Sequence, residues 1–69
     1  MKISYDKDAD AMYIEFREGE FKRNQKIDDF TIIDFDVDDN MMGIELLEVS
    51  KRIPSESLAK LEVDNLVVV

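Results

Sequence analysis

The first residues whose spacing suggests chemistry are three aspartates near the start of the chain. Asp6, Asp8 and Asp10 form a D-x-D-x-D pattern, which opens many calcium-binding loops because alternate side chains of a tight loop can reach one ion. A complete calcium loop also needs glycine at its sixth position and glutamate at its twelfth, where this chain has Ala11 and Arg17. We therefore interpret Asp6 as the cap of a turn and Asp8 and Asp10 as solvated, with metal binding by the three as an alternative.

A second group of carboxylates lies in the middle of the chain. Asp34 and Asp36 alternate with apolar residues, so they share one face of a predicted strand, and a hairpin would bring Glu45 near them. Such a cluster can hold Mg²⁺ or act as an acid/base pair. Nothing in the sequence supplies a histidine or a nucleophile to complete a catalytic site, so we expect no enzyme, no catalytic residues and no cofactor.

The same three carboxylates are better explained as a binding surface. Clustered like charges repel one another, which lowers stability unless a cation or a basic protein surface neutralises them. We predict that Asp34, Asp36 and Glu45 form the partner-binding face of a protein-interaction module with a basic partner. The alternative is a divalent-cation-binding domain that uses these carboxylates or the three N-terminal aspartates.

The charge of the whole chain agrees with a basic partner. Its 69 residues include 17 acidic and 9 basic side chains, for a net charge of −8. Nucleic acids and anionic membranes are bound through an excess of Lys and Arg, so we expect neither as a partner. The sequence has no run of about 18 apolar residues and no signal-peptide pattern, which favours a cytoplasmic location. With no cysteine and so short a chain, we expect one modest core and a single domain, residues 1–69.

The elements that must position these acids follow from the period of the apolar residues. Alternation of apolar and polar side chains predicts strands at residues 2–6, 12–17, 21–27, 30–37 and 41–49. Lysines in the third of these segments are typical of an edge strand, because they discourage pairing with another edge. A hairpin turn is expected at residues 38–40, with Asn40 in the left-handed conformation that asparagine tolerates.

The C-terminal part of the chain has a different pattern. Pro54 and Glu56 suit the first turn of a helix, which we predict at residues 54–62. Residues 66–69 form an apolar tail that we expect to pair with a sheet edge. The predicted fold is therefore α+β: a small antiparallel β-meander of about five strands in residues 1–49, with the short helix packed on one face. We also expect a homodimer that buries an open sheet edge or the tail.

Two stretches of this sequence resemble a known family. They are YDKDADAMYIEF near the start and IDDFTIIDFDVDDNMMGIELLEVSKR in the middle, which match the ordered motifs Y-D-x-x-A-D-A-x-Y-I, D-x-D and G-I-E-x-L. The chain thus resembles the domain of unknown function 2283 family from residue 1 to about residue 53. The resemblance implies no catalytic residues, because the family is uncharacterised. It implies an antitoxin-like role, because its members have been suggested as partners of small toxin-like proteins.

Overall fold

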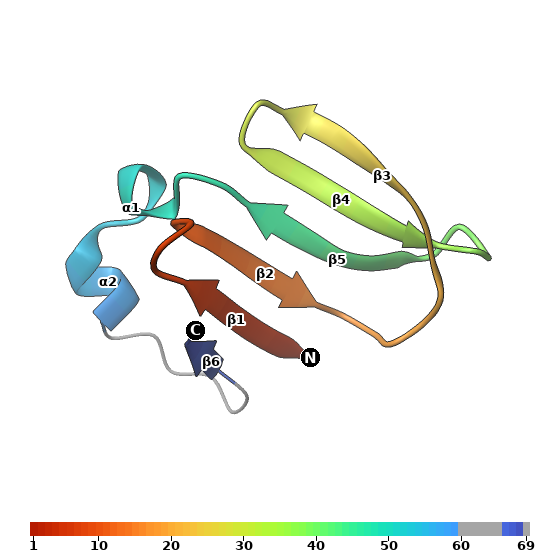
Figure 1. Cartoon of the computed structure of the whole chain (residues 1–69), viewed down its shortest axis with the longest axis horizontal. Helices are drawn as coiled ribbons and strands as arrows, with labels where there is room; N and C mark the ends of the chain where they lie inside the picture. The colour runs from red at the N-terminus through yellow and green to blue at the C-terminus, as the bar shows by residue number, and fades with distance from the viewer. Residues whose placement is uncertain (60–65, 69) are drawn as a thin grey trace.

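The computed structural model describes residues 1–59 and 66–68, with the strand at 66–68 described by its backbone. Its described strands form one sheet in the order β3-β4-β5-β2-β1-β6, and two short helices follow β5 in the chain (Figure 1). The elements are β1 Lys2–Asp6, β2 Ala11–Glu15, β3 Phe21–Asp28, β4 Thr31–Asp36, β5 Met41–Leu46, α1 Val49–Arg52, α2 Ser55–Ala59 and β6 Leu66–Val68. The predicted α+β class with five antiparallel strands is confirmed.

The strand order places β2, near the start of the chain, beside β5, the last strand of the predicted meander. Strands β3, β4 and β5 form consecutive antiparallel hairpins, and β1 and β2 form another. The chain then crosses the sheet between β2 and β3, so that β2 pairs with β5 on its other side rather than with β3 (Figure 1). Every residue of β3 is exposed, which confirms its expected place at an edge. A central position beside β2 requires an apolar strand, and β5 supplies one with Ile44 and Leu46.

The apolar tail supplies the strand at the other edge of the sheet. Residues Leu66–Val68 form β6, which pairs with β1 in parallel, with Ile3 opposite Leu66 and Tyr5 opposite Val68. The expected pairing of the tail with a sheet edge is therefore seen for residues 66–68. Residue 69 and residues 60–62 of the predicted helix lie outside the described residues.

The predicted end of the fifth strand is wrong in detail. The fifth strand was predicted to reach residue 49, but β5 ends at Leu46 and α1 begins at Val49. Glu48 has a left-handed backbone with φ 50°, which turns the chain out of the strand direction. Val49 is 0% exposed, so its burial at the start of α1, rather than in a strand, accounts for its apolar character.

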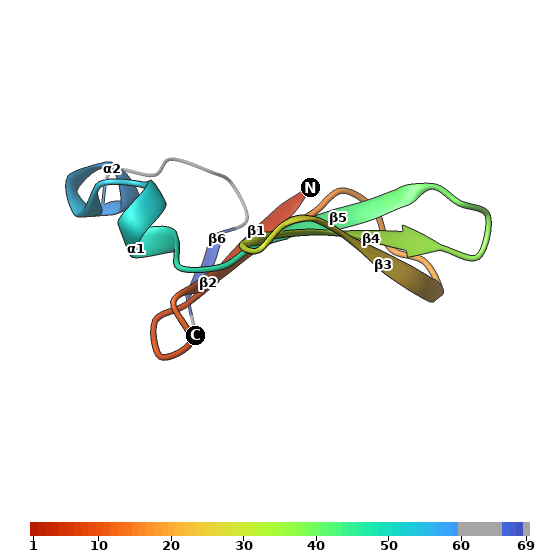
Figure 2. The same ribbon diagram turned by 90° about the horizontal axis from the view of Figure 1, so that it is seen from above.

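The described helices do not cover a face of the sheet as a packed layer. Figures 1 and 2 show α1 and α2 beyond the end of the sheet where β5 finishes. None of the α2 residues Ser55–Ala59 is buried, which is consistent with this peripheral position. The described part of the predicted helix is α2, and α1 is the helix whose hydrogen bonds to the sheet region are seen, through Val49, Ser50 and Arg52. No helix among the described residues is long and apolar enough to cross a membrane.

Alternation along the strands divides the sheet into two chemically different faces. The apolar face comprises Ile3, Tyr5, Met12, Ile14, Ile33, Phe35, Ile44 and Leu46, which the strand registers place on one side. The polar face comprises Lys2, Ser4, Asp6, Ala11, Tyr13, Glu15, Asn24, Lys26, Ile32, Asp34 and Glu45. Asp34 and Glu45 thus share a face, as predicted.

Candidate functional site

The centre of the polar face is a tyrosine lying across a glycine. Tyr13 on β2 is opposite Glu45 on β5, and Gly43 of β5 lies between Glu15 on β2 and Asp34 on β4. A Cβ atom on Gly43 would lie 2.5 Å from the hydroxyl oxygen of Tyr13. The phenol therefore crosses β5 above Gly43 on its way toward Asp34. Only glycine leaves room for this crossing, because any other residue would place a side chain where the ring lies.

Burial and nearby negative charge act together on the Tyr13 hydroxyl. Burial raises the pKa of Tyr13 most, and the charge of Asp34 and a hydrogen bond to it raise the pKa further. The charges of Glu15 and Glu45 add smaller increases, and together they move the pKa from 10.0 to about 12. Tyr13 therefore stays protonated at neutral pH and acts as a neutral hydrogen-bond donor within a ring of three carboxylates.

These three carboxylates have no basic partner within the described part of the chain. The ion pairs found there use other acids, namely Asp29, Asp36, Asp39 and Glu48. Glu15, Asp34 and Glu45 are half-buried on the sheet surface, where water screens charge less completely than at an exposed position. Lys2, opposite Glu15, and Lys26 lie on the same face, but neither forms an ion pair with these three acids among the described residues. The acids around Tyr13 therefore give this part of the polar face a local negative potential.

Asp36, which was predicted to belong to this face, has a different role. Its side chain is buried, with the residue 4% exposed, and its Oδ1 accepts hydrogen bonds of 2.9 Å from the backbone amides of Asp38 and Asn40. The Asn40 amide contributes most to lowering the pKa of Asp36, and Arg17, whose Nε lies 3.9 Å from Oδ2, lowers it as well. Asp36 therefore organises the β4–β5 turn instead of presenting its carboxylate beside Asp34 and Glu45.

The same turn corrects the prediction for Asn40. The left-handed residue is Asp39, with φ 62°, and Asn40 is not among the residues with positive φ. The Asp36 carbonyl accepts the Asp39 amide at 3.0 Å while the Asp36 carboxylate binds the amides on either side. These three hydrogen bonds determine which residue of the turn takes the left-handed conformation, and side-chain preference alone does not reveal them.

Two of the three N-terminal aspartates are engaged in hydrogen bonds within the chain. Asp6 caps a turn as predicted, since its Oδ1 accepts from the amides of Asp8 at 3.0 Å and Ala9 at 3.2 Å. Asp8 is exposed. Within the residues that the structure describes, no group of three or more acidic side chains is arranged to hold a metal ion.

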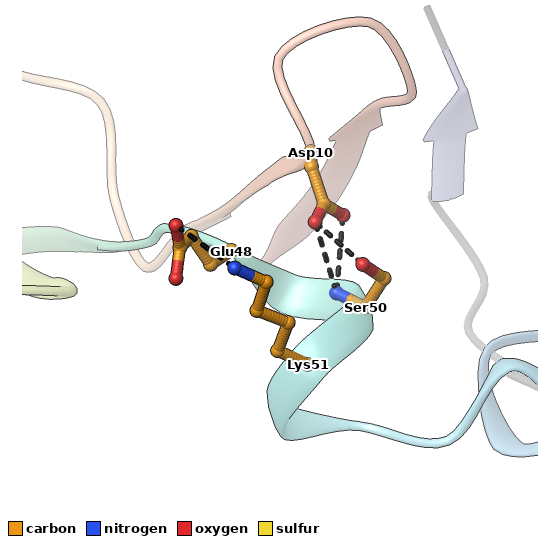
Figure 3. A network of polar contacts seen from close by, with 4 residues as sticks. All are labelled: Asp10, Glu48, Ser50 and Lys51. Carbon is orange, nitrogen blue, oxygen red and sulfur yellow. Dashed lines mark hydrogen bonds and ion pairs between the residues drawn. The ribbon is translucent and has the colours of Figure 1, made fainter.

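Asp10 joins the β1–β2 turn to the first helix, a role that differs from its predicted solvation. Its carboxylate accepts hydrogen bonds from the Ser50 amide at 3.0 Å and the Ser50 hydroxyl at 2.6 Å (Figure 3). It also accepts a hydrogen bond from the Tyr5 hydroxyl at 2.9 Å. The Ser50 hydroxyl contributes most to the lowered pKa of Asp10. The Asp10 carbonyl also accepts the Val49 amide at 3.0 Å. Asp10, which has a left-handed φ of 52°, is therefore a structural link across 40 residues of sequence.

A hollow of about 230 Å³ opens beside Tyr13 on the polar face. Its lining combines small side chains with two carboxylates and the phenol, and consists of Ser4, Asp6, Ala9, Ala11, Met12, Tyr13 and Glu45. A flexible side chain with an apolar stem and a cationic end matches this lining, because the small residues can contact the stem while the acids bind the charge.

Sequence reasoning found Asp34 and Glu45 but did not connect them with Tyr13, Glu15 and Gly43. Both motifs that contain the missing residues are visible in the sequence, as D-A-x-Y-I and G-I-E-x-L. Their connection depends on β2 lying beside β5, which a meander in chain order does not predict.

Comparison with known proteins identifies the family. The family described as "Protein of unknown function (DUF2283)" matches residues 2–50, which include β1 to β5 and the start of α1. The chain belongs to this family, and the suspected resemblance is confirmed. No curated protein and no solved structure matches the chain.

Proposed function

We propose that this protein is a protein-interaction module whose polar face binds a basic protein. The observation that supports the proposal is the group of carboxylates from Glu15, Asp34 and Glu45 around a protonated Tyr13, none of which forms an ion pair within the described residues. A cationic surface would neutralise the repulsion among these acids. Binding would be favoured because it removes an unfavourable electrostatic free energy that the unbound protein already has.

The hollow beside Tyr13 is the proposed anchor point for one lysine or arginine of the partner. Glu45 and Asp6 at the rim would bind the cationic end, and the Tyr13 ring would contact it by a cation–π interaction. The net charge of −8 would speed the encounter with a basic protein at low ionic strength. Asp36 contributes indirectly, because it holds the turn between the two strands that carry Asp34 and Glu45.

Within this class, we assign the protein an antitoxin-like role toward a small basic toxin-like protein. The role follows from the suggestion already made for its family, and the acidic face is chemically suited to it. A small acidic domain can neutralise a basic protein by covering the cationic surface that the latter uses for its own activity.

The test is a capture experiment followed by affinity measurements. The tagged protein is used to isolate binding proteins from a lysate of its own host at low and moderate salt, and the recovered protein is purified and titrated. We expect one stoichiometric basic protein whose affinity falls steeply as salt increases.

Two charge-matched double variants locate the surface. Asp34→Asn with Glu45→Gln should weaken binding about tenfold or more, because it removes two of the three acids around Tyr13. Asp8→Asn with Glu18→Gln changes the net charge equally, but at exposed positions outside the polar face, and should change the affinity about twofold at most. Equal affinities for the two double variants would show that net charge, and not this face, determines binding.

A further inference from the structure

Within residues 1–59 and 66–68, no second layer covers the apolar face of the sheet. Among its side chains only Met12 is buried, at 4% exposed, whereas Ile14, Ile33, Phe35 and Ile44 are only half-buried. Stable domains pack at least two layers of secondary structure around a core. Figure 2 shows the sheet as a single layer with α1 and α2 beyond its end. The described residues therefore leave the apolar face without a covering element.

The dimensions of the molecule agree with an open single layer. Its principal extents are 37 × 28 × 16 Å, and its accessible surface is 4939 Å². A compact monomer of 8.0 kDa has an accessible surface of about 4,450 Å². The excess of about a tenth indicates that the chain on its own is less compact than a folded monomer of its mass.

We propose that the apolar face packs against the same face of a second copy, related by a two-fold axis, to form a β-sandwich. Two sheets packed in this way lie about 10 Å apart with their strands about 30° from parallel. With strands about 4.8 Å apart and about 18 Å long, a sheet of this size covers roughly 500 Å² per copy. The pair would bury about 1,000 Å², which reaches the threshold of a biological interface and is typical of a weak, reversible one.

The distribution of charge favours a second copy over the basic partner on this face. The strand residues of the apolar face include one acid, Asp28, which lies opposite Thr31 at the β3 edge. The acids Glu15, Asp34 and Glu45 all lie on the opposite face. Two copies with a charge of −8 each can therefore meet at the centres of the apolar faces with both polar faces directed outward. A cationic surface would lose hydration at the apolar face and find an acid among the strand residues only at its edge.

A polar rim marks one end of the proposed interface. The Arg23 guanidinium on β3 lies 4.1 Å from the centre of the Phe35 ring, and its Nε lies 3.6 Å from Oδ1 of Asp39. Arg23 thus covers the outer end of the apolar face while its charge remains partly exposed, as is usual at the rim of a protein interface. The interface would be centred on Ile14, Ile33 and Ile44, which adjoin one another across β2, β5 and β4.

Sedimentation equilibrium of the full chain, over a range of protein and salt concentrations, tests this proposal. We expect a species of about 16 kDa, twice the 8.0 kDa of one chain, that becomes more stable as salt increases. Salt screens the repulsion between two acidic copies, whereas it weakens binding of a basic partner. A species of 8.0 kDa at every concentration, or open-ended association into larger species, would overturn the closed dimer.

Two adjacent isoleucines of β4 provide matched variants. Ile33 points to the apolar face and Ile32 to the polar face, since Ile33 is opposite Ile44 and Ile32 is opposite Glu45. Ile33→Thr should weaken dimerisation about tenfold, because the lost apolar contact occurs twice in a symmetric pair, while Ile32→Thr should change it about twofold at most. Far-UV circular dichroism establishes that each variant is folded. Equal dimer affinities for the two folded variants would show that the apolar face is not the interface.

The dimer proposal and the basic-partner proposal can be tested independently of each other. Asp34→Asn with Glu45→Gln should abolish much of the partner binding without weakening the dimer, since these acids lie on the outer faces. Ile33→Thr should weaken the dimer without removing the acidic surface on the individual copy. Sedimentation of both variants, with and without the captured basic protein, distinguishes the two interfaces.

Discussion

The Tyr13 phenol lies directly over the backbone of Gly43, so close that a Cβ on Gly43 would be 2.5 Å from the phenol oxygen. The same Cβ would lie 2.6 Å from the carbonyl oxygen of Ile14, which belongs to the neighbouring strand. Gly43 therefore serves two purposes, since it lets β2 and β5 approach each other and lets Tyr13 reach Asp34. This crossing joins three strands into one surface.

Gly43→Ala should destabilise the protein by about 1–3 kcal/mol, because the added methyl group meets backbone as well as side-chain atoms. Gly19→Ala is the matched control: its Cβ would have its nearest contacts at 3.6 Å, with the side chain of Asp36, which is ordinary van der Waals distance. We expect Gly19→Ala to change the free energy of unfolding by less than about 0.5 kcal/mol. Urea denaturation measures both, and equal effects would contradict the close approach at Gly43.

The raised pKa of Tyr13 predicts a loss of stability at alkaline pH. Because the folded-state pKa of about 12 is above the unfolded value of 10.0, this contribution is fully present below pH 10 and is lost as the pH rises toward 12. In Tyr5→Phe, where Tyr13 is the remaining tyrosine, phenolate absorbance should titrate near pH 12 while the chain is folded. Adding Asp34→Asn should lower this midpoint. A midpoint near pH 10 in the folded protein would contradict the burial and charge assigned to Tyr13.

Asp36→Ala should lower the melting temperature at pH 7 by about 5 °C or more, because two turn amides lose their acceptor. The folded-state pKa of Asp36 is below 3.8, so its stabilisation is present above that pH and is lost as the pH falls through the lowered pKa. The variant should therefore lose less stability than the wild type on acidification from pH 5 to pH 2. Asp38→Asn, at an exposed neighbouring position, should retain the wild-type pH dependence.

Asp10→Ala should loosen the junction between the β1–β2 turn and α1. The change removes the acceptor of the Tyr5 and Ser50 hydrogen bonds and also places alanine at a left-handed φ of 52°. Asp10→Gly separates the two effects, because glycine accepts the backbone conformation but lacks the carboxylate. We expect faster amide hydrogen exchange at Ser50 in both variants, and a lower melting temperature for alanine than for glycine. Unchanged exchange at Ser50 would show that the carboxylate does not hold the junction.

Some features could be predicted from local pattern because they depend on local chemistry. The lysines of residues 21–27 indicated an edge strand, and the structure places β3 at the edge with every residue exposed. Asp6 was predicted to cap a turn, and it accepts two amides within three residues. The shared face of Asp34 and Glu45 followed from alternation and one hairpin. Each of these inferences uses only residues close in sequence or joined by a short turn.

Other features could not be predicted because they depend on contacts between distant segments. Val49 was expected at the end of the fifth strand, but it is buried at the start of α1, where its amide donates a hydrogen bond to the Asp10 carbonyl. Asp36 alternates with Asp34 in the sequence, yet the amides of the following turn hold its carboxylate away from the surface. Periodicity predicts which face of a strand a side chain is on, but it does not predict which hydrogen-bond donors lie close to that side chain in the fold.

The sequence by itself determined the acidic charge of −8, the division of the sheet into an apolar and a polar face, and the polar edge strand, because composition and the two-residue period of a strand are local properties. The tertiary structure alone decided that β2 lies beside β5, and therefore that Tyr13, Gly43 and Asp34 meet. Strand order depends on the free energies of pairing between distant segments, which compete with one another and are not encoded in the period of any one strand.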